Sequence, residues 1–187
     1  MNRLPYRPLA LMLLALALPF AASAADYTVQ PSGSTLGFAG SFQGSGFNGQ
    51  FGKWTAAISY DAAKLASSKF DVTVDLSSAK TGDSDRDSAL PGTDFFDVAK
   101  YPQAHFVTTG FHQQGSQVIA DGTLTLHGVT KPVSLNVSFK PQGSGATLDV
   151  SGTLNRIDFG VGGGQYKDTS VIAADVKVTA HLVLSAK

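Results

Sequence analysis

The sequence predicts an all-β protein built from one antiparallel sheet of eight long strands. Three observations support this prediction. Apolar and polar residues alternate along most of the chain, as in FDVTVDL (70–76), and side chains on a strand point alternately to opposite faces. Glu, a strong helix former, is absent, whereas the strand formers Val and Thr are plentiful. Short links rich in turn residues, such as QGSG (142–145), separate the alternating segments.

The alternating segments predict nine strands, of which the first is a short edge piece beside eight longer ones. Their ranges are 26–30, 35–43, 47–60, 69–77, 104–112, 116–127, 130–140, 145–156 and 171–185. The clearest pair is the hairpin ADGTLTLHGVTKPVSLNVSF (120–139), because both of its arms place apolar residues on one face. Several segments are longer than strands of a sandwich usually are, which favours a barrel.

One segment, TGDSDRDSALPGTDFFDVAKYPQ (81–103), breaks the alternation. Its Asp-rich start and its Pro and Gly predict one or two short helical turns inside a long crossing loop. We expect Asp83 to cap the first turn, with acidic residues behind it, where the helix dipole favours them. The Asp spacing over 83–94 also imitates a calcium loop, but Ser88 replaces the turn glycine and Asp replaces the bidentate Glu.

The N-terminus has the anatomy of a secretory signal peptide. Arg3 and Arg7 precede an apolar run over 9–20, and Ala-Ser-Ala follows at 22–24. The run is shorter than the roughly 20 residues that a membrane-spanning helix needs. We therefore expect cleavage after Ala24, which leaves residues 25–187 as one exported domain.

Composition argues against several classes of function. The formal net charge is zero and no Lys/Arg run is present, so the footprint of a nucleic-acid-binding protein is missing. The chain has no Cys, and an exported protein without Cys must be held together by its own core. The His residues are scattered, without HExxH or His-x-His spacing, so we expect no metal and no other cofactor. A G-x-S-x-G motif is also missing, and we expect a protein that is not an enzyme.

The apolar face of such a sheet can cover a packed core, a lipid bilayer or a bound molecule. A membrane barrel would carry aromatic girdles at both ends of its strands, whereas the aromatic residues here fall mostly in the first half and in 81–103. An eight-stranded barrel is just wide enough to be filled by side chains or to hold one small ligand. Small residues on the apolar faces leave room for a ligand or mark bends, and from the pattern alone both readings stand. These residues are Gly40, Ala56, Ala120, Gly122, Gly152 and Ala180.

Three motifs, in this order, resemble the YceI-like family of bacterial periplasmic polyisoprenoid-binding proteins. They are RDSALPGTDFFDVAKYPQAHF (86–106), GTLTLHGVTKPVSL (122–135) and RIDFGV (156–161). The resemblance extends over essentially all of 25–187. It implies a lipocalin-like antiparallel barrel in the periplasm, whose long apolar pore holds an isoprenoid tail, as in isoprenoid quinones or prenyl diphosphates. Many members carry His two residues after the Arg-Asp pair, where this chain has Ala89, so the head-group preference stays open.

On this resemblance we expect a tunnel lined by side chains from several strands and from the crossing loop. The expected lining residues are Phe38, Trp54, Ile58, Phe95, Phe96, Phe106, Leu124, Leu126, Leu135, Val150 and Val178. Each of them is equally suited to an ordinary core. Phe95 and Phe96 would form a lid over the opening or a plug within the core. Arg86 and Asp87 would form a structural ion pair or lie at the mouth, near a head group.

The expected function is to bind an amphiphile with a long isoprenoid-like tail, as a periplasmic carrier or store that contacts a membrane transiently. Two alternatives remain. The first is a stress-related barrel with a filled core that acts by protein interaction, and the second is an enzyme that acts on the bound lipid. The sequence leaves the oligomeric state open, a homodimer included.

Overall fold

A computed structural model describes residues 24–187, and the predicted signal segment up to position 23 lies outside the described residues. The strands are β1 (Ala25–Phe42), β2 (Ser45–Phe51), β3 (Trp54–Tyr60), β4 (Lys69–Asp75), β5 (Ala79–Lys80), β6 (Gln103–Gln114), β7 (Gln117–Leu126), β8 (Val129–Gln142), β9 (Gly145–Asn155) and β10 (Asp175–Ala186). Between them lie a short helix and 3-10 turns: α1 (Ser84–Ala89), η1 (Leu65–Ser67), η2 (Leu76–Ser78), η3 (Arg156–Phe159) and η4 (Gly164–Tyr166).

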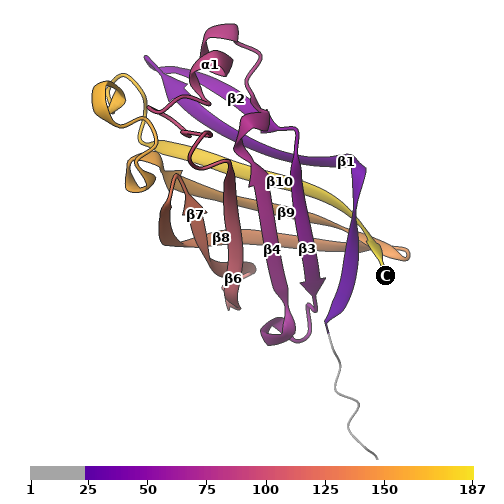
Figure 1. The fold of residues 1–187 in the computed structure, drawn as a ribbon. Helices are drawn as coiled ribbons and strands as arrows, with labels where there is room; N and C mark the ends of the chain where they lie inside the picture. The colour runs from indigo at the N-terminus through magenta and orange to yellow at the C-terminus, as the bar shows by residue number, and fades with distance from the viewer. Residues whose placement is uncertain (1–23) are drawn as a thin grey trace, which may run out of the picture.

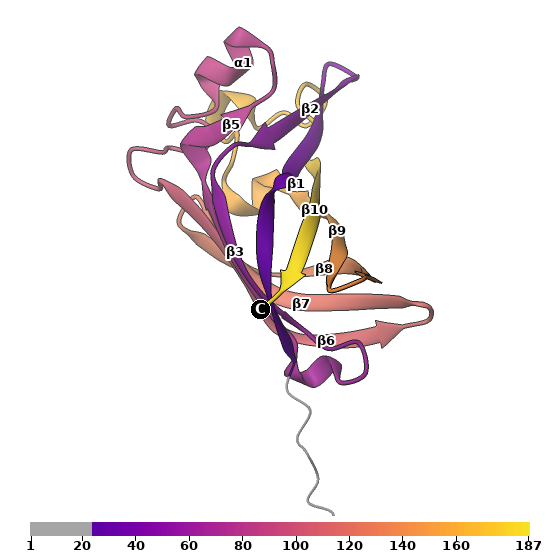
Figure 2. The ribbon, with the colours of Figure 1, turned by 90° about the vertical axis from the view of Figure 1, so that its right-hand side faces the viewer.

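Eight of these strands form a closed antiparallel barrel, which confirms the predicted fold class. Their order is β1-β3-β4-β6-β7-β8-β9-β10, and β10 pairs back onto β1. Strand β1 pairs with β3 only over Ala25–Tyr27. Farther along β1, the same edge is taken by β2, which in turn pairs with β5. Strands β2 and β5 gather with α1 at one end of the barrel, here named the α1 end (Figures 1 and 2).

Strand β1 is one continuous strand, although the sequence predicted two strands, 26–30 and 35–43, separated by a turn at 31–34. The sequence PSGS at these positions reads as a turn, but the register with β10 only shifts between Gln30 and Thr35. Ser34 holds this bulge together, because its hydroxyl donates to the carbonyl of Gln30 and accepts from the N–H of Val183. Gly33, with φ of +87°, supplies the left-handed backbone that the bulge requires.

The predicted strand 47–60 is divided into β2 and β3 at Gly52 and Lys53. Here the N–H of Gly52 donates to the carbonyl of Ser78, and the N–H of Lys53 donates to the hydroxyl of the same residue, so neither pairs with β1. The chain thereby leaves the edge of β1 and enters the barrel wall beside β4. Similarly, β10 begins at Asp175 rather than at 171, because the preceding residues form turns.

The end of the barrel opposite α1 is closed by an aromatic cluster, which consists of Tyr27, Tyr60, Phe70, Phe111 and Phe139. The ring of Tyr60 lies at its centre, with centroid distances of 4.5 Å to Phe139 and 6.1 Å to Phe70. Edge-to-face and tilted pairs of this kind are favourable beyond the area they bury. Burial raises the pKa of the Tyr60 hydroxyl, and the neighbouring Asp61 carboxylate adds to the rise.

The apolar faces of the strands point into the barrel. On β10, Leu182 and Leu184 are buried, whereas Lys177 and His181 are exposed. No helix within 24–187 is long and apolar enough to span a membrane.

Candidate functional site

An apolar cavity of about 250 Å³ lies inside the barrel, between the aromatic cluster and the α1 end. All eight barrel strands contribute side chains to its lining. The polar residues of this lining are Ser41, Thr179 and Arg156. An engineered apolar cavity of about 150 Å³ stays dry and binds benzene or xenon. The cavity in this barrel is therefore large enough, and apolar enough, to receive hydrocarbon.

Every residue that the sequence predicted for the lining faces this cavity. The barrel wall contributes Phe38 from β1, Trp54 and Ile58 from β3, Phe106 from β6, Leu124 and Leu126 from β7, Leu135 from β8, Val150 from β9 and Val178 from β10; the crossing loop contributes Phe95 and Phe96. Ile58 also packs against the aromatic cluster, so it belongs to the floor of the cavity.

The sequence prediction missed lining residues in several places, which include the whole contribution of β4 and two groups at the α1 end. Phe47 and Phe51 lie on β2, outside the barrel proper, and their rings cover the cavity at the α1 end. Phe159 and Val161 follow β9, where the chain leaves the sheet and turns back over the opening. The alternation of Phe47, Gly49 and Phe51 on one face was visible in the sequence and could have identified the first pair.

The sequence left open whether small residues on the apolar faces leave room for a ligand or mark bends, and at several glycines the structure shows a third arrangement. A Cβ atom on Gly49 would come within 2.3 Å of the Phe38 ring, and one on Gly40 within 2.8 Å of the Phe47 ring. Gly122 is covered in the same way by the Phe106 ring. The space above these glycines is thus occupied by large rings, which lie across the bare backbone. Among the other small residues, Ala56 and Ala180 line the cavity, whereas Ala120 is part of the core.

The crossing loop is part of the core and also part of the cavity wall. Phe96 is buried and its ring lies 6.3 Å from that of Phe51 on β2. Phe95 stacks with Tyr166 of η4 at 4.9 Å between ring centroids. The two phenylalanines therefore join the loop to both neighbouring segments at the α1 end.

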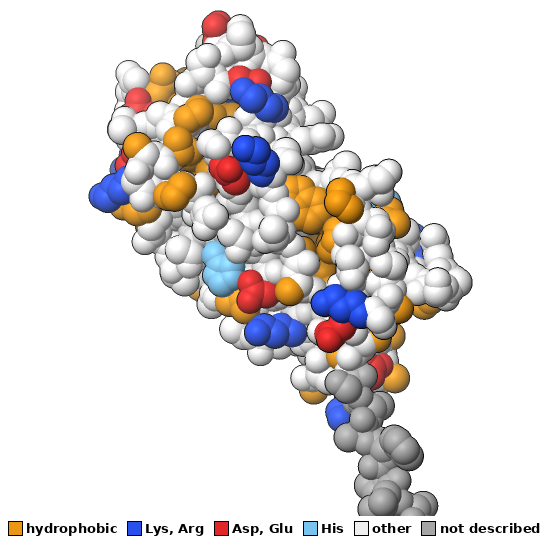
Figure 3. Space-filling model, turned by 45° about the vertical axis from the view of Figure 1, so that its right-hand side comes forward, with side chains coloured by type: hydrophobic (Ala, Val, Ile, Leu, Met, Phe, Trp, Pro, Cys, Tyr) orange, Lys and Arg blue, Asp and Glu red, His pale blue; other side chains and the backbone are white. Residues whose placement is uncertain are grey.

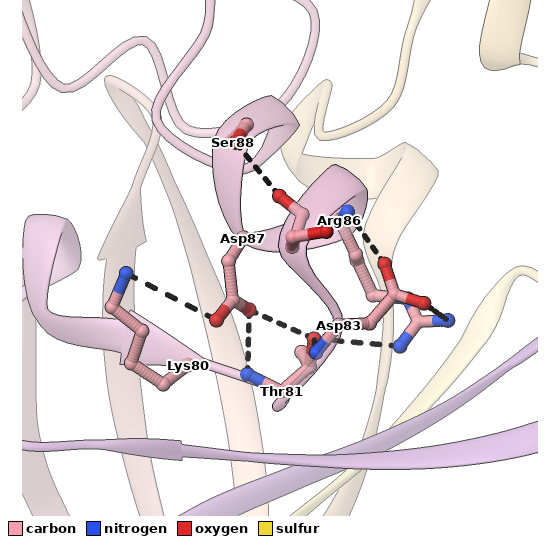
Figure 4. Close-up of polar contacts among 7 residues, drawn as sticks. Lys80, Thr81, Asp83, Arg86, Asp87 and Ser88 are labelled. Atoms are coloured by element: carbon pink, nitrogen blue, oxygen red, sulfur yellow. Dashed lines mark hydrogen bonds and ion pairs between the residues drawn. The ribbon is translucent and has the colours of Figure 1, made fainter.

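Asp83 caps the start of helix α1, as the sequence predicted. The side chain of Asp83 accepts a hydrogen bond from the N–H of Arg86 at 2.9 Å, which makes it the N-cap. Asp87 accepts from the N–H and the hydroxyl of Thr81 at 2.7 and 2.8 Å, and Lys80 lies 4.0 Å away (Figure 4). The N–H of Thr81 is the main cause of the lowered pKa of Asp87, followed by the Thr81 hydroxyl.

The predicted ion pair between Arg86 and Asp87 is wrong. Arg86 pairs instead with Asp83 at 3.8 Å, and its guanidinium lies 4.2 Å from the centre of the Phe47 ring. Consecutive residues on a helix do not face each other, so Arg86 and Asp87 reach different partners. Neither residue lines the cavity. Through Phe47, however, Arg86 contacts the outer side of a ring that does.

The buried guanidinium of Arg156 holds together the segments that follow β9. Only 5% of this residue is exposed, and burial lowers its pKa from the ordinary value. No ion pair found in residues 24–187 includes it. Its N–H groups instead donate to backbone carbonyls over 2.7–3.0 Å, those of Val161, Gly162, Tyr166, Ile172 and Ala173.

Most of the titratable pairs lie on the outer surface. Cross-strand His–Asp contacts join His105 to Asp71 at 2.8 Å, His112 to Asp121 at 2.8 Å and His181 to Asp149 at 2.6 Å. All are about half exposed, and none of these side chains is part of the cavity lining. Charges of both signs are interspersed on the face shown in Figure 3. The fourth histidine, His127, occupies the β7–β8 turn with φ of 51°, as a turn residue.

Comparison with known sequences and structures gives consistent matches over most of the chain. UPF0312 proteins of Pseudomonas savastanoi and Vibrio cholerae are 38% and 35% identical to it, over 76% and 78% of this chain and 79% and 82% of theirs. The crystal structure of Burkholderia cenocepacia BcnA matches with a TM-score of 0.80 at 31% identity, over 83% of this chain and 99% of that one.

Two further structures share the fold. Campylobacter jejuni YceI protein matches with a TM-score of 0.65 at 26% identity, over 74% of this chain and 84% of that one. A polyisoprenoid binding domain from Saccharophagus degradans matches with a TM-score of 0.67 at 18% identity, over 88% of this chain and all of that one, and shows the fold alone. The model of the YceI-like domain matches residues 27–184. Because this match spans most of the barrel and the curated relatives align over about three quarters of the chain, the protein belongs to the YceI-like domain family.

Proposed function

We propose that this protein binds an amphiphile with a long isoprenoid-like tail, such as an isoprenoid quinone or a prenyl diphosphate, and buries the tail in the barrel cavity. The observation that carries the proposal is the chemistry of the lining, to which every barrel strand contributes apolar side chains and in which the polar residues are Ser41, Thr179 and Arg156. The Saccharophagus degradans domain of the same fold is named for polyisoprenoid binding, which agrees with this assignment.

The physical basis is burial of hydrocarbon. Each CH₂ group removed from water contributes about 0.8 kcal/mol, so a long tail binds tightly without any polar contact. A strand of about ten residues rises roughly 33 Å, and a tilt of about 40° reduces this to near 25 Å along the barrel axis. The aromatic cluster occupies part of that length. Tail length is therefore selected by the depth of the cavity above the cluster.

The head group would remain outside, at the α1 end. Arg86 and Asp87 lie at this end but not in the cavity lining, and both already have partners within the protein. They would influence the head group through the position of α1 rather than by direct contact. The proposed role is that of a carrier or store in the periplasm, formed by residues 25–187 after export.

An enzyme acting on the bound lipid would require polar groups that converge on the reacting atoms. Arg156 is the charged residue of the lining, and its N–H groups already donate to backbone carbonyls. The His–Asp pairs lie on the outer surface, away from the tail. These observations favour binding over catalysis. The filled-core alternative is disfavoured by the cavity itself.

The direct test is native mass spectrometry of residues 25–187 purified from a bacterial periplasm, followed by organic extraction and identification of the lipid. We expect a stoichiometric prenyl lipid. A protein that purifies empty, and that also fails to take up added quinones and prenyl phosphates, would contradict the proposal.

A pair of neighbouring variants on β8 makes the test specific for the cavity. Leu135→Trp fills the interior with a larger ring and should abolish lipid occupancy. Asn136→Trp places the same ring on the exposed outer face and should leave occupancy unchanged. If a folded Leu135→Trp protein keeps its lipid, the tail does not lie along this wall.

A further inference from the structure

The two exposed large hydrophobic residues of 24–187 lie on chain segments that pair with each other. Phe42 is 39% exposed at the end of β1, and Val171 is 37% exposed in the segment before β10. The two chain segments are joined directly, because the N–H of Gln43 donates to the carbonyl of Val171 at 2.7 Å and Phe42 forms a β-bridge with Ile172. We name this pair, Phe42 and Val171, the apolar rim.

The apolar rim continues the cavity lining to the surface. On β1, Phe38 and Gly40 line the cavity, and Phe42 follows two residues later on the same face of the strand. On the other segment, Ile172 and Ala173 line the cavity and stand next to Val171 in the chain. The rim is thus the place where both walls of the cavity pass from buried to exposed.

Only a few hydrogen bonds hold the two sides of the rim together. Besides the bond from Gln43, the N–H of Ala173 donates to the carbonyl of Ser41 at 3.0 Å. Farther down, β1 and β10 are joined by an extended antiparallel ladder. Separating the rim therefore breaks a short stretch of pairing and leaves the barrel closed below it.

The segment that leads to Val171 carries one charge of each sign. Lys167 and Asp168 are neighbours in the same segment, and Asp168 accepts hydrogen bonds from the N–H and hydroxyl of Ser170. These donors lower the pKa of Asp168, so it stays ionised near neutral pH. Exposed apolar side chains beside one charge of each sign fit the interfacial region of a lipid bilayer and do not require anionic lipids.

We propose that the apolar rim docks onto a lipid bilayer and is the opening through which the tail passes between membrane and cavity. This inference rests on the proposed function, because a prenyl tail that crossed water would expose every CH₂ that the bilayer and the cavity bury. Contact between the rim and the membrane provides an apolar path from the bilayer to the cavity. Phe42 and Val171 enter the interface, and the pairing between Ser41 and Ala173 opens to admit the tail.

The first experiment separates transfer from equilibrium binding. The single Trp of the chain, Trp54, lines the cavity, and a quinone bound there should quench its fluorescence. Quenching is followed after adding phosphatidylcholine vesicles that carry a long-tailed ubiquinone, and separately at equilibrium with the same quinone in detergent micelles. For Phe42→Asp with Val171→Asp, we expect transfer from vesicles to slow roughly tenfold, equivalent to about 1.4 kcal/mol, while equilibrium quenching is unchanged.

Ala63→Asp is the matched control, because Ala63 is exposed in the β3–β4 turn at the opposite end of the barrel. It should alter neither transfer nor equilibrium quenching. Unchanged transfer from vesicles in the rim variant would overturn the docking proposal. A loss of equilibrium quenching in that variant would also overturn it, because the rim would then be part of the tail-binding site itself. If the parent protein shows no quenching in detergent, the proposed function fails rather than the docking site.

A second experiment tests docking without any quinone. In Trp54→Phe with Phe42→Trp, the single Trp lies at the rim, and vesicles of phosphatidylcholine alone should shift its emission to the blue. Adding anionic lipid should change the shift little. An emission maximum that stays at its value in water would show that the rim does not enter the bilayer.

Discussion

At the scale of single residues, Arg156 shows how the α1 end of the barrel keeps its shape. A buried guanidinium is costly unless its donors are paired, and here backbone carbonyls from three separate turns provide the pairing. Gly162 accepts one of these bonds with φ of 67°, and a Cβ there would approach the guanidinium to 2.4 Å. The arginine is thus the centre around which 156–173 folds.

Replacing this arginine should destabilise the protein strongly. Arg156→Met removes the donors and leaves buried carbonyls without partners, so we expect a loss of about 3–5 kcal/mol in the free energy of unfolding, measured in urea. Arg86→Met is the control. Arg86 is more exposed and loses an ion pair and a contact with one ring, which is worth about 1 kcal/mol. Equal losses for the two variants would show that the carbonyl cage is unimportant.

Glycines on β2 offer a second test at this scale. Gly49→Ala places a methyl group where the Phe38 ring now lies, so the ring must swing into the cavity. We expect lipid occupancy, measured by native mass spectrometry, to fall severalfold while the barrel remains folded. Gly46→Ala on the same strand meets only a backbone oxygen at 3.9 Å and should bind as the parent does. Equal occupancy in both variants would mean that the Phe38 ring does not limit the space for the tail.

At the scale of elements, the contact between Asp87 and Thr81 ties α1 to the end of β5. The pKa of Asp87 is lowered from 3.8, so the folded state favours its ionised form. The stabilisation is fully present above the ordinary carboxyl pKa and is lost as the pH falls through the lowered value. We expect hydrogen-exchange protection over 81–89 to fall selectively on acidification below about pH 4. Asp87→Asn should show reduced protection already at neutral pH.

Asp85→Asn provides the comparison, because Asp85 lies on the same helix and is exposed. This variant should keep the protection of the parent at neutral pH and lose it on acidification in the same way. If Asp87→Asn also keeps full protection at neutral pH, the carboxylate of Asp87 does not anchor the helix.

The strands were predictable because each strand buries one face, and a period of two is a local signal. The wall residues Leu124 and Leu135 followed from that alternation together with the family resemblance. Features that depend on tertiary contacts were not predictable. The PSGS bulge in β1 needs the N–H of Val183 from the far end of the chain, and the cage around Arg156 needs carbonyls from several turns. The error at Arg86 arose because sequence adjacency was taken for contact.

At the scale of the whole molecule, the barrel is divided along its axis into two parts with different packing. At one end the aromatic cluster fills the interior with rings in mutual contact. At the other, Phe38, Phe47 and Phe106 lie against glycines on the wall, and the space between the walls remains open. The closed part forms the floor of the cavity, and the open part leaves space that the proposed lipid tail would fill.

A tail that completes this packing should raise the stability of the whole barrel. At a free concentration one hundred times its dissociation constant, a ligand that binds only the folded state adds about 2.7 kcal/mol. For a domain of this size, each kcal/mol raises Tm by about 2–4 °C, so we expect a rise of about 5–11 °C over the lipid-free protein in calorimetry. The rise should grow with prenyl length and level off once the tail reaches the aromatic cluster, because further units stay outside the cavity. Leu135→Trp should level off at a shorter tail or show no rise, and Asn136→Trp should follow the parent. A rise that is independent of tail length would place the hydrocarbon outside the barrel.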